Sequence, residues 1–363
     1  MDAIVKTDEA ALAVSLEMFP SQQLLSQAIR HKCTGLLFNA LAASSIRSEA
    51  ARELLRGSRL HAQGALRQAP AVRAQLDELS RALNERGVPH AALKTGARLQ
   101  EGDNVAEVTP IFDLDVLIPE DRETDALAAL APIGYVAQPV ASRRPSRFLA
   151  GYRLHHHLSP LVAEGRPKTL ELHRSFATPW RFSLPTNWIA LRPHLKSRGS
   201  ERPYEFRLNA FAAALHLIVH GTGMYRLYDT VILALDLRKA PELLTQLQSA
   251  LIEERIQPLG TNAVLALAAS MAGIPLEQSD RTRAFLDWVR RREGLPIPLY
   301  RRALYIDIWY GNGRSMRGSC TVMTATVFSK LAQWHGPTAA ARYAASNAWG
   351  SIGAALYNAM MLR

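Results

Sequence analysis

Apolar and polar positions alternate strictly in one stretch within the first third of the chain. Phe112, Leu114 and Val116 fall on one face of a strand, and Asp113 and Asp115 fall on the other. Aspartate is a poor strand residue, and two like charges on one face repel each other. A hard divalent cation such as Mg²⁺ relieves this repulsion, because it prefers oxygen ligands. The pattern therefore predicts a strand whose polar face either binds a metal ion or is the solvated face of an edge strand.

A short apolar run ends at a lysine before this strand. Residues 90–94 indicate a buried strand, which Thr95 and Gly96 interrupt before a helix-like segment at 97–100. Backbone N–H groups at such a turn can approach a phosphate, and Lys94 adds a positive charge there. Lys94 and Gly96 are therefore candidate phosphate contacts, with an ordinary strand-to-helix turn as the alternative.

Two further strands are predicted after the alternating one. Residues 153–158 and 169–173 flank turn residues at 164–167, which indicates an antiparallel hairpin. In the second strand two leucines share one face, and Glu171 and His173 share the other. Glu171 is therefore available as a third metal ligand or as a general base.

Three consecutive histidines occur in the first strand of this hairpin. His155 and His157 share a strand face, and zinc accepts imidazole ligands. A zinc site needs three or four converging ligands, and the sequence does not identify the others. The favoured interpretation places His155 and His157 beside the polar face of the sheet, near phosphates, with His156 pointing away.

Helical patterns surround the predicted sheet on both sides. An early helix is expected to end near Gly35, residues 45–69 favour a helix, and a separate long helix is expected after Pro70. From about Glu205 the chain is expected to be helical to its end. The later helices are expected near 241–254, 259–271 and 280–292. The predicted organisation is α+β, with a helical N-terminal region (1–85), a sheet domain (86–185) and a helical C-terminal domain (200–363).

Several polar residues interrupt apolar helical sequence in the C-terminal part. They are His220, Arg226, Asp229 and Asp236. One explanation for each is a buried salt bridge or a helix cap. The functional explanation places some of them near the mouth of a nucleotide site.

The formal net charge of +11 comes mostly from arginine and favours anionic partners. Arg143, Arg144 and Arg147 lie close together, and short basic runs occur at 290–292 and 301–302. These runs are too short for a basic tail. Solvated helix faces are the favoured interpretation, and nucleic-acid binding is the alternative.

Features of targeting and redox state point to the cytoplasm. No run of 18 or more apolar residues occurs, so no membrane-spanning helix and no membrane partner are expected. The N-terminus has early acidic residues and lacks the pattern of a secretory signal. Cys33 and Cys320 form no metal-type spacing, and both are expected to be reduced thiols.

Taken together, these motifs resemble the uncharacterised nucleotidyltransferase-like proteins of the DNA polymerase beta superfamily. The matching order is a helix, Gly87-Val88-Pro89, Leu93-Lys94-x-Gly96, Asp113-Leu114-Asp115-Val116-Leu117-Ile118, a helix ending Gly134-Tyr135, and Leu170-Glu171-Leu172-His173-Arg174. Leu217-Ile218-Val219-His220, Tyr225-Arg226-Leu227 and Leu235-Asp236-Leu237 are similar to the family's C-terminal helical signature. The resemblance implies a small mixed sheet of nucleotidyltransferase type, flanked by helical regions.

The resemblance also implies a reaction, the Mg²⁺-dependent transfer of a nucleoside monophosphate from a nucleoside triphosphate such as ATP. Asp113 and Asp115 would ligate one or two Mg²⁺ ions, and Glu171 would complete the metal site and help to deprotonate the acceptor. These three residues are the candidate catalytic and metal-binding set.

Positive and polar groups around the carboxylates would bind the triphosphate and support the site. The candidate nucleotide-binding residues are Lys94, Gly96, Arg143 and Arg147. The candidate supporting residues are His157, His173, His220, Arg226 and Asp236. The acceptor is open between a small molecule, a peptide, a protein and a transfer RNA.

Two departures from the family pattern motivate alternatives. Thr95 stands between Lys94 and Gly96, where family members commonly read Leu-Lys-Gly, and the arginine often found before the paired carboxylates is replaced by Thr109 and Pro110. One alternative is a degenerate relative that binds a nucleotide or a partner without catalysis. Another is a basic helical scaffold that binds nucleic acid, with affinity that falls steeply as salt rises.

Overall fold

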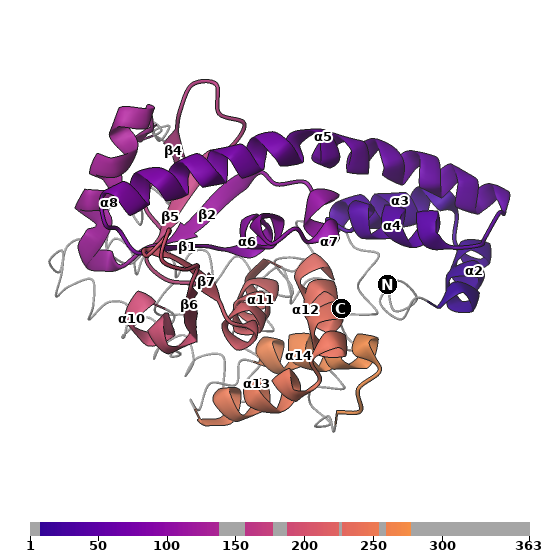
Figure 1. Ribbon diagram of the computed structural model, residues 1–363. Coiled ribbons are helices and arrows are strands. Elements are labelled where there is room, and N and C mark those ends of the chain that lie inside the picture. Colours follow the sequence, from indigo (N-terminus) through magenta and orange to yellow (C-terminus); the bar gives the residue numbers. More distant parts are fainter. Residues whose placement is uncertain (1–7, 138–156, 177–186, 225–226, 254–258, 277–363) are drawn as a thin grey trace, which may run out of the picture.

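The structure, a computed structural model, describes residues 8–137, 157–176, 187–224, 227–253 and 259–276 (Figure 1). It consists of N-terminal helices, one mixed sheet and C-terminal helices, which confirms the α+β fold expected from the sequence. None of the helices in this described part combines the length and the apolar character that crossing a membrane requires.

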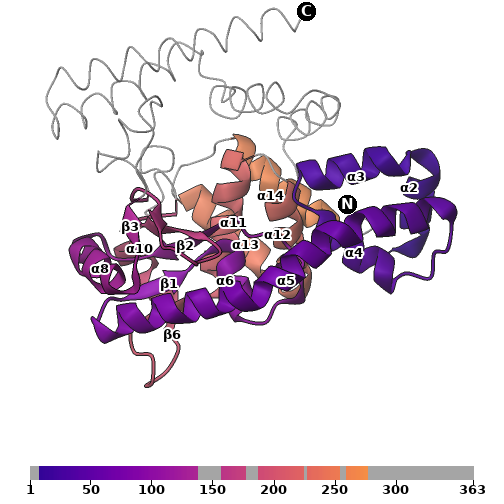
Figure 2. The same ribbon diagram turned by 90° about the horizontal axis from the view of Figure 1, so that it is seen from above.

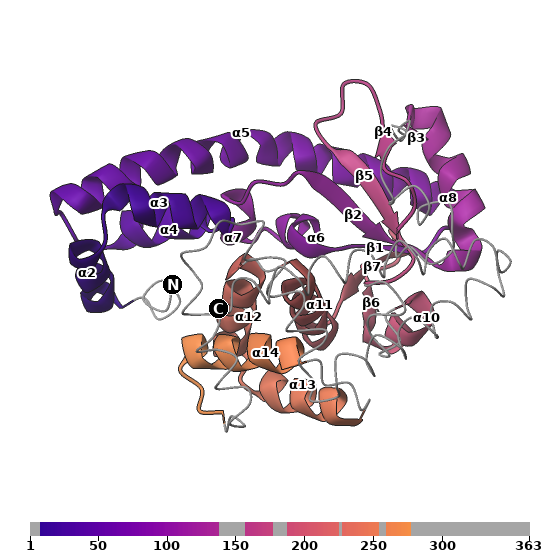
Figure 3. The same ribbon diagram turned by 180° about the vertical axis from the view of Figure 1, so that it is seen from behind.

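A long helix connects the N-terminal helices to the sheet. The described N-terminal helices are α2 (Glu9–Met18), α3 (Ser21–Arg30), α4 (Thr34–Ala43) and α5 (Glu49–Glu85). Leu37, Leu41 and Leu54 form a buried cluster where the short helices pack on the first part of α5. The hydroxyl of Ser48 begins α5 by accepting a hydrogen bond from the Ala51 N–H at 3.2 Å. Figures 2 and 3 show α5 continuing from these helices across the sheet.

The expectation of two helices on either side of Pro70 is wrong, because α5 passes through this residue as one helix. Proline removes one helix hydrogen bond and crowds the preceding turn. The two halves of α5, however, are each fixed by packing, since Leu54 is buried among the N-terminal helices and Leu76 and Leu83 are buried against the sheet. Tertiary packing on both sides outweighs the local cost of an exposed proline.

The early helix α3 ends at Arg30, within the segment expected for its end, but Gly35 is not the residue beyond that end, because it lies inside the next helix, α4. A Cβ at this position would lie 2.2 Å from the carbonyl oxygen of Val108. Glycine is therefore required by the close approach of α4 to the segment that leads into the central strand.

The described strands form one seven-stranded sheet in the order β3-β4-β5-β2-β1-β7-β6. Their bounds are β1 (His90–Ala92), β2 (Asp113–Leu117), β3 (Val136–Ala137), β4 (Leu161–Val162), β5 (Thr169–His173), β6 (Leu195–Ser197) and β7 (Glu205–Leu208). The central strand β2 runs parallel to β5 and antiparallel to β1. The alternating stretch of the sequence is therefore confirmed as a strand, but it is central rather than at an edge.

The expectation that the chain turns helical at Glu205 is wrong, because residues 205–208 form β7, parallel to β1. Phe206 and Leu208 alternate with polar residues and pack in a cluster with Trp188, as one face of a strand should. The predicted antiparallel hairpin is confirmed by the pairing of β4 and β5. Its first strand is residues 161–162, later than expected.

The two faces of the sheet are covered by different helices (Figure 1). Leu114 and Val116 of β2 pack with residues of α5 and α8 (Glu123–Leu130). On the other face, Leu117 packs with Trp188 of α10 (Trp188–Leu191). The remaining short helices are α6 (Lys94–Gln100), α7 (Asn104–Glu107), and the 3-10 helices η1 (Glu120–Arg122), η2 (Ala131–Ile133) and η3 (Arg192–His194).

The C-terminal helices share a core with the N-terminal ones. They are α11 (Ala210–Met224), α12 (Leu227–Lys239), α13 (Glu242–Glu253) and α14 (Leu259–Ala272), so the helices predicted near 241–254 and 259–271 are confirmed. Cys33 and Leu36 are buried in the same cluster as Val231 and Ile232 of α12. Burial raises the pKa of the Cys33 thiol to about 12. Cys320 and the helix predicted near 280–292 lie outside the described residues.

Leu79 tests the packing of α5 on the sheet. Its side chain is 1% exposed, whereas that of Leu60 on the same helix is 73% exposed. We expect Leu79→Ala to lower the free energy of unfolding by about 2–5 kcal/mol, because it leaves a cavity beneath the helix. The matched Leu60→Ala should change it by less than about 0.5 kcal/mol. Equal effects of the two substitutions in urea unfolding would contradict this packing.

Candidate active site

Parallel pairing of β2 and β5 brings two acidic side chains together at the centre of the sheet. Asp115 lies directly opposite Glu171 in the register. The Asp115 side chain is only 3% exposed, and that of Glu171 is 20% exposed. Side chains that face each other across neighbouring strands are close enough to interact. The predicted third carboxylate therefore does lie beside the Asp-x-Asp pair.

Lys94 reaches the same carboxylate from the turn between β1 and α6. Its Nζ lies 2.6 Å from Asp115 Oδ1. Its backbone φ is +52°, a left-handed conformation that non-glycine residues rarely adopt. Such strained residues concentrate at functional sites, where the surroundings hold them in place. Lys94 thus begins α6 rather than ending β1, which corrects the strand expected over residues 90–94.

Gly96 lies within the first turn of α6 and is buried. A Cβ there would lie 3.8 Å from Leu76 and 3.9 Å from Leu114, which are ordinary contacts. The strand does end before Thr95 and Gly96, as expected, but the helix begins at Lys94 rather than at Ala97, so both residues belong to it.

His173 is a second cation beside Asp115. Its Nε2 lies 2.7 Å from Asp115 Oδ1 and 3.7 Å from Glu171 Oε2, and its Nδ1 lies 3.4 Å from the Ser175 carbonyl oxygen. All three neighbours are acceptors, so both ring nitrogens can donate only in the imidazolium form. Burial alone would lower the pKa of His173, but its hydrogen bonds to Asp115 and Glu171 raise it above the ordinary value.

These cations keep the central carboxylates ionised. Burial would raise the pKa of Asp115, yet Lys94 and His173 together hold it far below its usual range. Burial acts in the same way on Glu171, and its hydrogen bond with His173 is the main influence that lowers its pKa. Asp113 differs, because burial and the neighbouring Asp115 raise its pKa. The site therefore combines two carboxylates whose ionised form is stabilised, Asp115 and Glu171, with a third, Asp113, whose ionised form is not.

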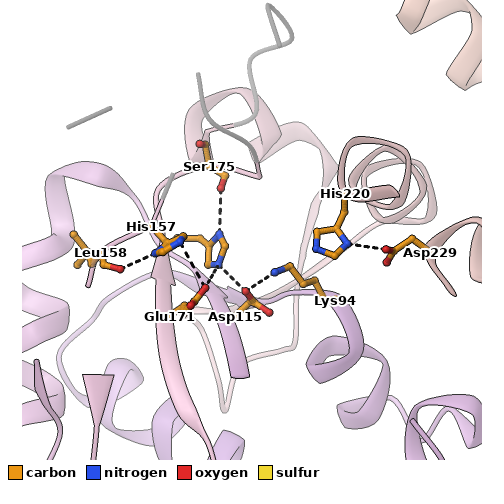
Figure 4. A network of polar contacts seen from close by, with 9 residues as sticks. Lys94, Asp115, His157, Leu158, Glu171, Ser175, His220 and Asp229 are labelled. Atoms are coloured by element: carbon orange, nitrogen blue, oxygen red, sulfur yellow. Dashed lines mark hydrogen bonds and ion pairs between the residues drawn. The ribbon is translucent and has the colours of Figure 1, made fainter. Parts of the chain in front are cut away.

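His157 is the described member of the histidine triplet, and His155 and His156 lie outside the described residues. Its Nε2 lies 3.8 Å from Glu171 Oε2, and its ring centroid lies 5.3 Å from that of His173 (Figure 4). Burial lowers the pKa of His157, so it is neutral at pH 7. It lies beside the polar face of the sheet, as the sequence predicted.

Ligand atoms that could hold one metal ion come from Asp115, Glu171 and His173, and these atoms lie within 4.8 Å of one another. Two of the three residues offer hard oxygen atoms, which Mg²⁺ prefers, and Asp113 starts the same strand. The carboxylates of Asp115 and Glu171, with Asp113 beside them, therefore fit a hard divalent cation, whereas His173 in its imidazolium form would orient these carboxylates and not ligate the ion. Among the described residues, the histidine triplet contributes nothing to this group.

A cavity of about 380 Å³ opens beside these acids. One side carries Lys94, Asp113 and Asp115 of the sheet domain, and the other carries residues of α11 and α12. Its full lining is Lys32, Lys94, Thr95, Gly96, Thr109, Pro110, Ile111, Phe112, Asp113, Asp115, His220, Tyr228 and Asp229. Two lysines and three aspartates in one cavity provide both anion-binding and cation-binding groups.

Sequence reasoning missed several of these lining residues. Lys32 lies before α4 with a φ of +58°, and its Nζ lies 4.5 Å from the centroid of the Phe112 ring. Burial raises the pKa of Tyr228 to about 12, although Thr109 and Thr95 beside its hydroxyl act against this shift. No local pattern in the sequence marks these residues, because they reach the cavity from segments that are far apart along the chain.

The candidate supporting residues of the C-terminal helices separate into two places. His220 lines the cavity, and its Nδ1 lies 2.9 Å from Asp229 Oδ2. Asp236 instead accepts hydrogen bonds from Arg98, at 2.9 Å, where α12 meets α6. It therefore fits the explanation of a structural salt bridge. Arg143, Arg147 and Arg226 lie outside the described residues.

The family model of the Uncharacterised nucleotidyltransferase family matches residues 18–276, well over half of the chain. The chain belongs to this family. No curated protein and no solved structure matches it. The matched range contains the whole described sheet, the acidic cluster and the cavity wall from α11 and α12.

Asp236→Asn tests whether this residue is structural. The Arg98 and Asp236 side chains are 19% and 20% exposed, so the pair is largely shielded from solvent. We expect the substitution to lower the free energy of unfolding by about 1.5–3 kcal/mol, because it removes a charged hydrogen bond between α6 and α12. The control Asp121→Asn, at an exposed position of η1, should change it by less than about 0.5 kcal/mol. If urea unfolding gives the same small change in the free energy of unfolding for Asp236→Asn as for the control, the Arg98–Asp236 pair contributes nothing to stability.

Proposed function

We propose that this protein is a cytoplasmic, Mg²⁺-dependent nucleotidyltransferase that moves a nucleoside monophosphate from a nucleoside triphosphate to an acceptor. The observation that carries the proposal is the facing pair Asp115 and Glu171 beside a cavity that also holds Asp113 and Lys94. Membership of the nucleotidyltransferase family supports the class of reaction.

Asp113, Asp115 and Glu171 would hold the metal. Their oxygen atoms suit Mg²⁺, and Asp115 and Glu171 are already ionised at neutral pH, because Lys94 and His173 stabilise the charge of Asp115 and a hydrogen bond from His173 stabilises that of Glu171. Bound Mg²⁺ neutralises charge that develops on the attacking and leaving oxygens of an in-line displacement. His173 would keep both carboxylates oriented through its hydrogen bonds.

Cationic side chains would bind the triphosphate. Lys94 Nζ is held by Asp115 at 2.6 Å, and Lys94 and Lys32 both line the cavity. Ammonium groups form charge-assisted hydrogen bonds with phosphate oxygens. The partly enclosed cavity would exclude water around these contacts, which strengthens each of them.

Nucleotide binding measured by calorimetry tests the proposal. We expect the protein to bind at least one of the four nucleoside triphosphates in the presence of Mg²⁺ and to lose this binding without the metal. Asp113→Asn and Asp115→Asn should each weaken binding by about tenfold or more, because each removes a negative ligand from the cation. Asp121→Asn makes the same change outside the site and should bind like the wild type.

The outcomes separate this proposal from its alternatives. A folded wild type that binds no triphosphate would exclude the nucleotidyltransferase activity. Binding without turnover would favour a degenerate relative. Affinity for a DNA or RNA duplex that falls steeply with salt and is unchanged by Asp113→Asn would favour a nucleic-acid scaffold.

A further inference from the structure

We propose that His220, positioned by Asp229, is the general base that takes the proton from a hydroxyl group of the acceptor. This inference rests on the proposed nucleotidyl transfer and adds to it the residue that activates the acceptor and the chemical class of the acceptor. It assigns a catalytic role to the helical wall of the cavity.

The first observation is the pairing of the two side chains. His220 Nδ1 lies 2.9 Å from Asp229 Oδ2, across the contact between α11 and α12. The Asp229 side chain is 8% exposed and that of His220 is 19% exposed. A carboxylate that accepts the Nδ1 proton fixes the tautomer and leaves Nε2 unprotonated. A shielded aspartate behind a histidine is the arrangement that holds an imidazole ready to accept a proton at its other nitrogen.

The second observation is where the other nitrogen lies. Figure 4 shows the His220 ring between Asp229 and Lys94, with its second nitrogen on the side of Lys94 and Asp115. His220 and Asp229 both line the cavity that Lys94, Asp113 and Asp115 line from the sheet. The imidazole therefore faces the metal-binding and phosphate-binding groups across the space that substrates would occupy.

The third observation is that other bases near the site are already engaged. Glu171 lies 3.7 Å from the His173 ring and belongs to the group of atoms that would hold the metal ion, so its oxygen atoms are already engaged. His173 itself is engaged by Asp115. Among the described residues that line the cavity, His220 is the one imidazole. We therefore assign the base to His220 rather than to Glu171.

Two further groups lie near His220 in the fold. His216, one turn earlier on α11, is fully buried and stacks on Phe176 with ring centroids 4.4 Å apart. Burial holds the pKa of His216 well below its ordinary value, so this neighbour is neutral. Lys32 and Lys94 both line the cavity that His220 lines, and Lys94 is paired with Asp115.

Nucleotidyl transfer to a hydroxyl group forms one bond, breaks another and moves one proton. The acceptor oxygen forms a bond to the α-phosphorus of the triphosphate, while its proton moves to Nε2 of His220. The bond between the α-phosphorus and the oxygen bridging to the β-phosphate breaks, and its electron pair leaves with pyrophosphate. The imidazolium returns its proton to pyrophosphate or to solvent. A hydroxyl is the acceptor that needs such a base, because it becomes a strong nucleophile only as its proton is removed.

The kinetic test measures pyrophosphate release from ATP and Mg²⁺, with water and with glycerol as hydroxyl probes. We expect His220→Ala to lower the rate by about 10²–10⁴-fold while leaving ATP affinity unchanged. Added imidazole should restore part of this rate, which it would not do if His220 were purely structural.

Asp229→Asn should lower the rate without changing ATP affinity. The control His194→Gln alters a half-buried histidine of η3 that packs on Phe211 of α11, the helix that carries His220. This variant should retain the wild-type rate. A His220→Ala variant that binds ATP and releases pyrophosphate like the wild type would overturn the proposal.

A spectroscopic test is independent of nucleotide binding. In ¹⁵N-histidine NMR of the free protein, with signals assigned through His220→Gln, we expect the proton of His220 on Nδ1 and an unprotonated Nε2. Asp229→Asn should remove this preference. A proton found on Nε2 would overturn the proposal even if the protein binds ATP. If the wild type binds no triphosphate, the proposed nucleotidyl transfer fails, and this tautomer still shows whether the pair is built as described. If the wild type binds ATP but releases no pyrophosphate, a degenerate relative is favoured and the general-base role of His220 is overturned.

Discussion

Asp115 is a carboxylate buried to 3% exposure at the centre of the sheet, and an uncompensated charge in that position would cost several kcal/mol. Two cations remove this cost, Lys94 at 2.6 Å and His173 at 2.7 Å, and both contact the same oxygen atom. Lys94 adopts a left-handed backbone conformation at the start of α6, beside this contact. His173 in turn connects Asp115 to Glu171. The local geometry of three chain segments is therefore arranged around one negative charge.

The same charge explains why the site lies where the helices meet the sheet. β2 and β5 hold the acids rigidly, because their neighbours are fully buried leucines such as Leu114 and Leu170. The acids point away from the helices that cover this apolar face. On the opposite side, α11 and α12 supply His220, Tyr228 and Asp229 to the cavity. A rigid acidic wall thus faces a helical wall that carries different chemistry, which is how one cavity can combine metal binding with proton transfer.

Local sequence patterns predicted those elements whose own residues decide their structure. Asp113–Leu117 and Thr169–His173 alternate between apolar and polar side chains, and both form the expected strands with the expected faces. The predictions for Pro70 and for residues 205–208 were wrong for reasons that lie elsewhere in the chain. Pro70 stays helical because both halves of α5 are packed, and residues 205–208 form a strand because β1 offers a partner. Propensity is a weak guide wherever a distant segment supplies the packing or the hydrogen bonds.

The sequence by itself determined that the chain has an α+β fold, that three acidic residues occupy polar strand faces, and that these motifs are those of a nucleotidyltransferase family. It could do so because the period of a strand assigns each side chain to a face without knowledge of its neighbours. Only the tertiary structure decided that Asp115 pairs with Lys94 and His173, that Asp236 pairs with Arg98, and that His220 faces the acids. These contacts join residues far apart along the chain, and no local pattern encodes which segment packs beside which.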